Sequence, residues 1–393
     1  MNIKLFIVSG YRMDSLLFGA MQRTYYLAKA AKNLGIDVYL AHPGRTYEKN
    51  GIFYIHYGFT FKSWQFETLN SFFPSLNPLV IKDLSSLIEE IKPDIVQIEQ
   101  PYLFILSKIL RKVNFFKKVC VVLDEHNVEF LAMKKPNTLL LLPYVKYAEK
   151  IALNASDAIL VTSALDKHLL TKLYDVPKEK IFVIPNCIDI SKYSKEHASI
   201  NKLKLRVKEV AGFDHIALFH GTLSYYPNYE AANIIITKIA PIIKECLFII
   251  AGKDCPYSLI RKAKRIKNVR IFGYVKEIEK WLAICDVYVA PILRGSGTRI
   301  KILEAMATGC PIIATHKAVE GLGVKDGVHG LFYRKVNEDF IEGIRKLLKN
   351  DQLAYKLGKN ARFFVKRYDW STIDKKLYEV YSKFFPEGIG HDE

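Results

Sequence analysis

The segment from Gly295 to Pro311 contains the residues of this chain best suited to binding an anion. It begins Gly-Ser-Gly-Thr-Arg-Ile-Lys-Ile-Leu-Glu and lies between two apolar runs, Asp286–Ala290 and Pro311–Thr315, which are typical of buried strands. A strand, a glycine-rich loop and a helix start direct backbone N–H groups and the positive end of a helix dipole to one place. This order of elements predicts a phosphate-binding loop.

Three charged side chains lie at the start of the expected helix. Arg299 and Lys301 bring two full positive charges to the loop, and Glu304 lies one turn beyond Lys301 on the same helix face. We expect the cations to neutralise a nucleotide diphosphate and the Glu304 carboxylate to be free to accept hydrogen bonds from ribose hydroxyls. The alternatives are a surface ion pair, a solvated lysine and a carboxylate that complements the helix dipole.

A second polar group follows an apolar run in the first half of the chain. Asp124, Glu125, His126 and Asn127 come directly after the expected strand Val119–Leu123. Ligands of open α/β sheets bind beyond the carboxyl ends of the strands, so His126 is a candidate catalytic residue. Asp124, Glu125 and Asn127 are expected in the same loop, and the sequence does not distinguish which of them contacts a ligand.

Another acidic residue ends a different expected strand. Glu99 is the last residue of the expected strand Ile95–Glu99, and we take it as a candidate contact for a substrate other than the nucleotide. A lone histidine such as His126 is otherwise most often structural, and its position at a strand end favours the functional reading.

Apolar strands alternate with amphipathic helices along the whole chain, as in doubly wound α/β proteins. Strands are expected at Ile3–Val8, Asp37–Ala41, Ile52–Tyr57, Ile95–Glu99, Lys118–Leu123, Ala158–Thr162, Ile181–Ile184, Ile216–His220, Phe248–Ala251, Val269–Phe272, Asp286–Ala290, Pro311–Thr315 and Gly330–Tyr333. Helices are expected at Ala20–Leu34, Lys82–Ile91, Tyr144–Ala155 and Trp370–Phe385, among others.

This alternation predicts two tandem Rossmann-like domains that face a central cleft. The expected amino-terminal domain covers residues 1–190, the carboxyl-terminal domain residues 191–365, and a terminal helical segment residues 366–393. The length of 393 residues suits two domains of ordinary size.

The composition is that of a soluble globular protein, with 50% hydrophobic and 25% charged residues. No apolar run approaches the roughly 18 residues that span a bilayer, and the amino terminus is typical of a first strand and not of a signal peptide. The six cysteines show no C-x-x-C spacing and are expected as buried thiols in a reducing cytoplasm.

The net charge of +18 arises mainly after residue 190, with basic clusters at Lys202–Lys208 and Arg261–Arg270. Two interpretations stay open: solvated helix faces, or a surface that meets membrane lipid or nucleic acid.

The run Phe130–Tyr147 mixes aromatics, lysines and the patch Leu139–Leu142. That mixture suits either a surface resting on anionic lipid headgroups or a buried helix with ordinary flanking lysines. The expected location is cytoplasmic, with peripheral membrane contact.

Several motifs, in their order and spacing, resemble those of retaining GT-B fold glycosyltransferases of family 4, over nearly the whole chain. They are Glu149 with Ala155-Ser156-Asp157-Ala158, Ile184-Pro185-Asn186-Cys187-Ile188-Asp189, His220-Gly221-Thr222-Leu223, Ile250-Ala251-Gly252, Phe272-Gly273-Tyr274-Val275 and Gly295–Ala307.

The resemblance implies a hexosyltransferase that moves a sugar from a UDP- or GDP-activated donor to a glycan, lipid-linked or other hydroxyl acceptor. It implies that the carboxyl domain binds the donor and that the terminal helix crosses back to the amino domain. Catalytic roles fall to His126, Arg299 and Lys301. The implied donor contacts are Glu304, Gly295, Ser296, Gly297, Thr298, Gly273, Val275 and Gly19.

Two departures from the family pattern matter. Many relatives carry two glutamates eight residues apart, and Ser296 occupies the first of these positions here. Many also place an arginine and a lysine where this chain has Tyr225-Tyr226-Pro227-Asn228, which leaves phosphate binding to Arg299 and Lys301. There is no D-x-D pair placed to hold a divalent metal, and the resemblance likewise implies no metal and no cofactor beyond the donor substrate.

Other functions stay open as alternatives. A nucleotide-sugar epimerase or phosphorylase could use the same fold, but such enzymes normally need further acid/base groups in the site. A nucleic-acid-binding protein would use the basic second half, yet no recognised reading motif is present, so no nucleic-acid partner is expected. A non-catalytic subunit is disfavoured by the intact Arg299, Lys301 and Glu304 set.

Overall fold

The computed structural model divides the chain into two compact units. The first comprises Met1–Asn186 and Trp370–Glu393, and the second comprises Cys187–Asp369. The structure describes residues 2–13, 19–57, 77–112, 119–134, 136–193, 212–295 and 297–386. Of the predicted features, Ser296 and the basic cluster Lys202–Lys208 lie outside these ranges.

The first unit is built on an eight-stranded sheet in the order β3-β4-β2-β1-β5-β6-β7-β8. Its strands are β1 (Lys4–Val8), β2 (Asp37–His42), β3 (Tyr47–Lys49), β4 (Ile52–His56), β5 (Ile95–Glu99), β6 (Cys120–Glu125), β7 (Ala158–Val161) and β8 (Ile181–Val183). Every neighbouring pair is parallel except β3 and β4, which run antiparallel. The sequence predicted all of these strands except the three-residue edge strand β3.

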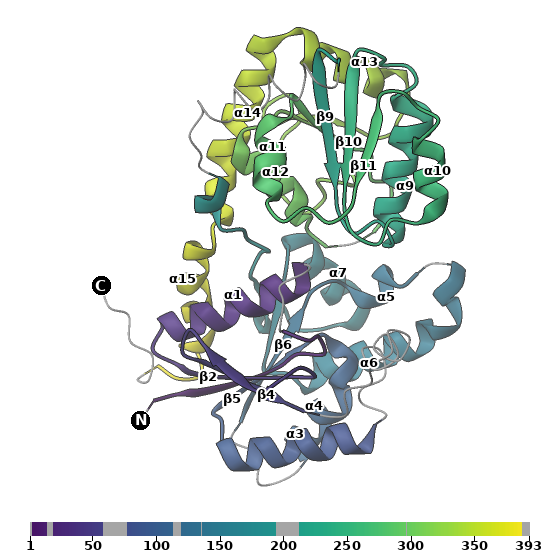
Figure 1. Ribbon diagram of the computed structural model, residues 1–393. Helices are drawn as coiled ribbons and strands as arrows, with labels where there is room; N and C mark the ends of the chain where they lie inside the picture. Colours follow the sequence, from purple (N-terminus) through teal and green to yellow (C-terminus); the bar gives the residue numbers. More distant parts are fainter. Residues whose placement is uncertain are drawn as a thin grey trace. The chain divides into compact units, whose positions relative to one another are not determined.

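Helices cover both faces of this sheet, as a buried parallel sheet requires. They are α1 (Gly19–Asn33), α3 (Pro78–Ile91), α4 (Phe104–Lys112), α5 (Glu129–Ala132), α6 (Leu142–Ala155), α7 (Ala164–Tyr174) and α15 (Ile373–Tyr381). Helices α1 and α15 lie on one side of the sheet, and α3 and α4 lie on the other (Figure 1).

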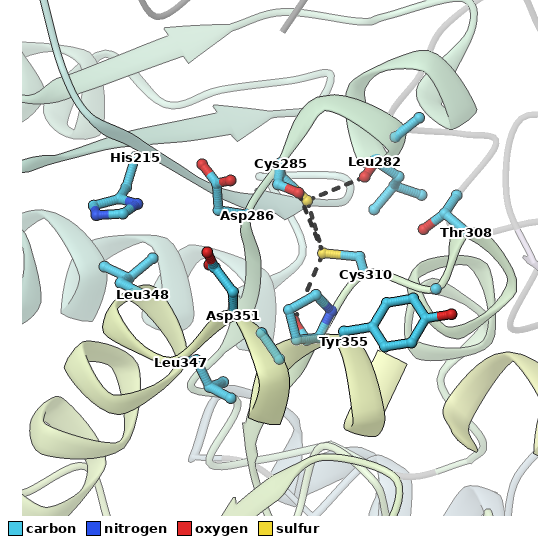
Figure 2. Close-up of a pocket in the computed structure, with 14 residues that line it drawn as sticks. His215, Leu282, Cys285, Asp286, Thr308, Cys310, Leu347, Leu348, Asp351 and Tyr355 are labelled. Carbon is cyan, nitrogen blue, oxygen red and sulfur yellow. Dashed lines mark hydrogen bonds between the residues drawn. The ribbon is translucent and has the colours of Figure 1, made fainter. Parts of the chain in front are cut away.

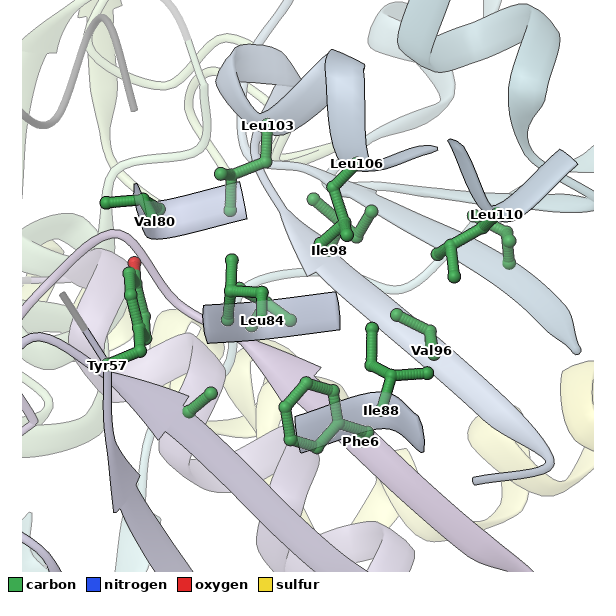
Figure 3. Close-up of a cluster of buried hydrophobic side chains, with 13 residues drawn as sticks. Phe6, Tyr57, Val80, Leu84, Ile88, Val96, Ile98, Leu103, Leu106 and Leu110 are labelled. Atoms are coloured by element: carbon green, nitrogen blue, oxygen red, sulfur yellow. The ribbon is translucent and has the colours of Figure 1, made fainter. Parts of the chain in front are cut away.

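One buried apolar cluster joins α3 and α4 to the sheet. Figure 3 shows Leu84 and Ile88 of α3 facing Phe6 of β1 and Val96 of β5, with Leu110 of α4 beside them. These side chains are at most 1% exposed, and each one buried fully is worth about 1.5–3 kcal/mol. Helix α3 begins at Pro78, which has no backbone N–H and so leaves none unpaired in the first turn. The Asn77 side chain caps this end by accepting a hydrogen bond from the Leu79 amide.

The terminal helix belongs to the first unit, where it packs on α1. Trp370 stacks on Tyr26 with ring centroids 4.4 Å apart and an interplanar angle of 12°. The Asn33 amide donates to the Asp374 carboxylate over 2.8 Å. The helix is shorter than expected, because a 3-10 turn at Trp370–Thr372 precedes α15.

The second unit contains a six-stranded parallel sheet in the order β11-β10-β9-β12-β13-β14. The strands are β9 (His215–His220), β10 (Cys246–Ala251), β11 (Val269–Phe272), β12 (Val287–Ala290), β13 (Ile312–Thr315) and β14 (Leu331–Tyr333). All six were predicted. The chain order reverses between β9 and β12, and ligands of such sheets bind beyond the carboxyl ends at that point.

Helices flank this second sheet on both sides as well. They are α9 (Tyr226–Ile234), α10 (Tyr257–Ala263), α11 (Ile278–Ile284), α12 (Ile300–Thr308), α13 (Glu338–Lys349) and α14 (Asp351–Val365). Figure 1 shows α9 and α10 on one side of the sheet and α11, α12 and α14 on the other. Within the described ranges, no helix combines the length and apolar character needed to cross a membrane.

Candidate functional site

Arg23 of α1 and Asp124 of β6 form a buried ion pair in the first unit. Their side chains are 1% and 0% exposed, and the guanidinium contacts the carboxylate through Nη2–Oδ1 at 2.6 Å and Nε–Oδ2 at 2.8 Å. Nη1 also donates to the Ile184 carbonyl over 2.7 Å. Burial alone raises a carboxyl pKa, but the charges of Arg23 and His126 outweigh it and hold the pKa of Asp124 well below its ordinary value.

Strand β6 is longer than the sequence predicted, and this corrects the placement of two acidic residues. Asp124 and Glu125 were expected in a loop after Leu123, yet they are the last residues of β6 and pair in register with Glu99 and Val161. Successive strand residues point to opposite faces. Asp124 therefore faces Arg23, while Glu125 faces the other side of the sheet.

His126 follows β6 directly and its ring is held by two carboxylates. Nε2 lies 2.9 Å from Glu99 Oε2 and 3.1 Å from Asp124 Oδ2, so this nitrogen carries the proton and donates. Burial lowers a histidine pKa, but Asp124 and Glu99 outweigh it and raise the pKa of His126 to about 9. The ring is 6% exposed, and Nδ1 has no hydrogen-bond partner among the described residues. The imidazolium thus keeps one N–H available for a ligand.

The same three residues offer a possible set of metal ligands. One ligand atom each from Glu99, Asp124 and His126 lies within 4.8 Å of the others. The guanidinium of Arg23, however, already contacts both carboxylate oxygens of Asp124. Because the Arg23 guanidinium already contacts both oxygens of Asp124, the geometry favours a hydrogen-bonded charge cluster over a metal centre.

A second buried acidic group fixes the helix that follows His126. Glu149 accepts hydrogen bonds from the Glu129 amide at 2.6 Å and the Phe130 amide at 3.2 Å, which caps the start of α5. Burial raises the pKa of Glu149 to about 7, against the opposing hydrogen bond from Tyr174. Burial also raises the pKa of Glu125 well above its ordinary value. Glu149, one of the family markers in the sequence, therefore has a structural role here.

In the second unit, Glu304 of α12 is held at the carboxyl end of β9. Its Oε2 accepts from His220 Nε2 and its Oε1 from the Tyr193 hydroxyl, each over 2.9 Å. His220 Nδ1 lies 3.1 Å from the Tyr288 hydroxyl, and the two are hydrogen-bonded. Burial alone raises a carboxyl pKa, but His220, Tyr193 and Lys301 together lower that of Glu304. The carboxylate expected to accept ribose hydroxyls thus already accepts two hydrogen bonds, and each oxygen keeps a second lone pair for a ligand.

Lys301, on the first turn of α12, lies against the end of β9. Its Nζ donates to Asn228 Oδ1 over 2.6 Å and lies 4.9 Å from the ring centroid of Phe219. Gly221 makes this approach possible: it has φ +146°, and a Cβ there would lie 2.3 Å from Lys301 Nζ. Burial and the neighbouring Arg299 lower the pKa of Lys301 to about 7. The sequence suggested a full charge, whereas the lowered pKa brings the titration of Lys301 close to neutral pH.

The glycine-rich loop after β12 contains two residues in the left-handed region, Gly295 with φ +104° and Gly297 with φ +73°. Arg299 occupies the N-cap position of α12 without a side-chain capping bond, and its Nη1 donates to the Gly297 carbonyl. The hydroxyl of Thr298 is buried and without a hydrogen-bond partner among the described residues. The loop thus gathers a cation and an unused hydroxyl beside the helix N-terminus, and Ser296 between the glycines lies outside the description.

The other predicted donor contacts lie at strand ends or helix starts. Gly273 and Val275 follow β11, where the Gly252 amide donates to the Gly273 carbonyl over 3.1 Å. A Cβ at Gly273 would have no atom within 4 Å, so this backbone is open to a neighbouring group. Gly19 begins α1 in the first unit. Their roles toward a donor stay predictions.

A cavity of about 240 Å³ lies elsewhere in the second unit, at the amino ends of β9, β12 and β13. Figure 2 shows Cys285 and Cys310 lining it, with their sulfur atoms 2.9 Å apart. His215 and Asp286, at the starts of β9 and β12, border the same space. Because Glu304 and Lys301 lie at the opposite end of this sheet, the cavity is separate from the site described above.

Comparison with known sequences places both units in glycosyltransferase families. The family described as Glycosyl transferases group 1 matches residues 214–350, and Glycosyltransferase Family 4 matches residues 19–192. A similar protein is the UDP-Gal:alpha-D-GlcNAc-diphosphoundecaprenol alpha-1,3-galactosyltransferase of Escherichia coli, 27% identical over 75% of this chain and 79% of that protein. Another is a phosphatidyl-myo-inositol mannosyltransferase of Mycobacterium leprae, 26% identical over 46% of this chain and 50% of that protein.

Solved structures share the fold of the whole chain at lower identity. Sucrose-phosphate synthase from Thermosynechococcus elongatus matches with a TM-score of 0.79 and 17% identity, over 98% of this chain and 100% of that one. HepE of Anabaena, solved in complex with UDP-glucose, matches with a TM-score of 0.73 and 16% identity, over 97% and 100%. The two parallel-sheet α/β units are therefore those of the GT-B fold.

The buried Arg23–Asp124 pair predicts a large effect of removing one partner. Arg23→Met leaves the Asp124 carboxylate buried without its cation, and we expect the first unit to lose about 3–5 kcal/mol of unfolding free energy in urea denaturation. Arg111→Met is the matched control, because Arg111 and Asp157 are 30% and 33% exposed and such a pair contributes about 1 kcal/mol or less. Equal losses in the two variants would contradict the importance of burial here.

Proposed function

Because the chain belongs to the group 1 and family 4 glycosyltransferases and has their GT-B fold, we propose that it is a retaining enzyme that transfers a sugar from a UDP-sugar to a lipid-linked acceptor. The observation that carries the proposal is the anion site of the second unit. Lys301, Arg299 and the start of α12 offer positive charge beside Glu304, which is already oriented by His220.

The donor half of the proposal follows from the charge that develops in the reaction. When the bond between the anomeric carbon and the diphosphate breaks, negative charge gathers on the leaving diphosphate, and fixed cations and N–H groups aimed at it lower the barrier. Arg299, Lys301 and the amides of the glycine-rich loop can do this without a metal ion. The spare lone pairs of Glu304 suit the ribose hydroxyls.

The acceptor half is proposed from the first unit and from the relatives. The His126 imidazolium presents Nδ1–H, which can donate to an oxygen of the reacting sugars. The acceptor hydroxyl attacks the anomeric carbon from the face that the diphosphate leaves, and its proton passes to the leaving phosphate. The Escherichia coli relative is named for a diphosphoundecaprenol acceptor and the Mycobacterium leprae relative for phosphatidyl-myo-inositol, which favours a lipid-linked acceptor.

A transfer assay tests this function. The purified chain is incubated with radiolabelled UDP-galactose, UDP-glucose, UDP-N-acetylglucosamine or GDP-mannose and a polyprenyl-diphosphate monosaccharide. We expect one UDP-sugar to give a lipid-soluble disaccharide with the anomeric configuration of the donor, as read by NMR. Isomerisation of the sugar nucleotide without an acceptor would instead establish an epimerase, and no turnover of any donor would contradict the proposal.

The titration of Lys301 predicts proton uptake on nucleotide binding. With a pKa of about 7, Lys301 is mostly neutral at pH 8 in the free protein. A bound diphosphate stabilises the charged form and raises this pKa, so up to about one proton enters per UDP bound. Calorimetry at pH 8 in buffers of different ionisation enthalpy measures this number. Lys301→Met should abolish the uptake, and an uptake near zero in the wild type would contradict a lysine that is neutral in the free protein and charged beside the diphosphate.

We also propose that part of the first unit rests on anionic membrane at the cytoplasmic face. Leu139, Leu140 and Tyr147 are 54%, 96% and 52% exposed, although all three are large and hydrophobic. The exposed Lys146 and Lys150 flank them on α6. Apolar side chains beside exposed lysines suit the boundary between lipid headgroups and acyl chains.

Vesicle sedimentation tests the membrane contact. Leu140→Glu should reduce binding to phosphatidylglycerol vesicles at low salt by about tenfold or more, because a charged side chain replaces an apolar anchor. Leu79→Glu on α3 is the control, since Leu79 is 49% exposed and lies outside the proposed surface. Equal binding of the two variants and the wild type would refute this surface.

A further inference from the structure

Strand β5 carries two polar side chains in a place where a parallel sheet normally has apolar ones. Gln97 and Glu99 are two residues apart, so they point to the same face, and they are 0% and 3% exposed. A buried amide or carboxylate is costly unless each of its polar atoms is hydrogen-bonded. Both side chains are hydrogen-bonded, and their partners come from distant parts of the chain.

The direction of each hydrogen bond follows from Glu99. A carboxylate only accepts, so the Gln97 Nε2 group, 2.7 Å from Glu99 Oε1, must donate. The amide oxygen of Gln97 is thereby left to accept, and the Tyr381 hydroxyl donates to it over 2.7 Å. Burial and nearby negative charge raise the pKa of Tyr381 well above its ordinary value, so it stays a donor. Tyr381, in the terminal helix α15, thus fixes the amide of Gln97 in one orientation.

The other oxygen of Glu99 completes the link to His126. Glu99 Oε2 accepts from Thr24 Oγ1 at 2.7 Å and from His126 Nε2 at 2.9 Å. The charged groups around the ring are Arg23 of α1, Asp124 of β6 and Glu99 of β5. With His126 protonated, two positive and two negative charges balance in a buried cluster, whereas a neutral ring would leave one negative charge uncompensated.

We propose that Glu99 is a positioning residue, which holds His126 as an imidazolium in one ring orientation, and that Tyr381 holds Glu99 in place through Gln97. The terminal helix is then part of the machinery of the first unit and not only a packing element. The catalytic meaning of this chain of hydrogen bonds rests on the proposed function, but its existence can be tested without any substrate. Glu99 thereby acts through His126 and is not the acceptor contact suggested by the sequence.

NMR titration of labelled histidine tests the first link. The chain has ten histidines, and the His126 signal is assigned by its loss in His126→Gln. In the wild type we expect a midpoint near 9 with both ring nitrogens protonated at neutral pH. Glu99→Gln should lower the midpoint by about one unit or more, because a neutral amide replaces a carboxylate in direct contact with the ring.

Glu90→Gln, an exposed change on α3 of the same unit, is the control and should leave the midpoint unchanged. A wild-type midpoint near the ordinary value of about 6.5, or an unchanged midpoint in Glu99→Gln, would overturn the proposal. If Glu99→Gln does not fold, the wild-type titration alone decides.

Tyr381→Phe tests the second link. Without the hydroxyl, the Gln97 amide loses its fixed orientation, and we expect its side-chain protons to exchange with D₂O about tenfold faster or more. In the transfer assay, kcat should fall by about threefold to tenfold while KM for the donor stays within about twofold, as expected when a catalytic group is held less firmly.

Tyr25→Phe removes a surface hydrogen bond of α1 and should change neither quantity. Unchanged exchange and an unchanged kcat in Tyr381→Phe would overturn the role of the terminal helix. If the wild type shows no transfer at all, the proposed function fails, while the histidine titration and the exchange rates still decide whether the chain of hydrogen bonds exists.

Discussion

Charge that is buried away from water has to be matched by opposite charge or by hydrogen bonds, and this requirement shapes both units of the chain. In the first unit, Asp124 is buried only because Arg23 reaches it from α1, and His126 stays charged only because Glu99 and Asp124 hold Nε2. The ion pair also ties the carboxyl end of β6 to the Ile184 carbonyl just after β8. The position of His126 therefore depends on contacts that join β6 to α1, to β5 and to the segment after β8.

The second unit meets the same requirement in a different way. Hydrogen bonds from His220 and Tyr193 stabilise Glu304 as a carboxylate. Lys301 lies beside the amide oxygen of Asn228, and burial lowers its pKa toward neutral pH. A site of this kind is ready for an anion, because a bound phosphate would restore the charge that burial suppresses. Gly221 permits this close packing, because a Cβ there would collide with Lys301 Nζ.

Much of the architecture could be predicted because parallel strands are apolar runs, and the strands of both sheets appeared at the expected places except for the three-residue β3. The misplaced end of β6 has a simple cause: Asp124 and Glu125 are acidic, and acidic residues are typical of loops. Within the strand, Asp124 is matched by Arg23, 101 residues earlier in the chain. The bond between Tyr381 and Gln97 spans 284 residues, so no local pattern in the sequence could reveal it. Glu304 was predicted as a site residue from the sequence, whereas its hydrogen-bond partners Tyr193 and His220 were not.

The central claim is that Glu304, oriented by His220, belongs to a nucleotide site in the second unit. Isothermal calorimetry of UDP binding to the wild type and to Glu304→Gln tests it most directly, with Glu338→Gln on the exposed start of α13 as the control. We expect UDP to bind the wild type and the control equally and to bind Glu304→Gln about tenfold more weakly or worse, since about 1.4 kcal/mol of hydrogen bonding to ribose is lost. Equal affinity in all three proteins, or no binding of UDP to any of them, would contradict the account.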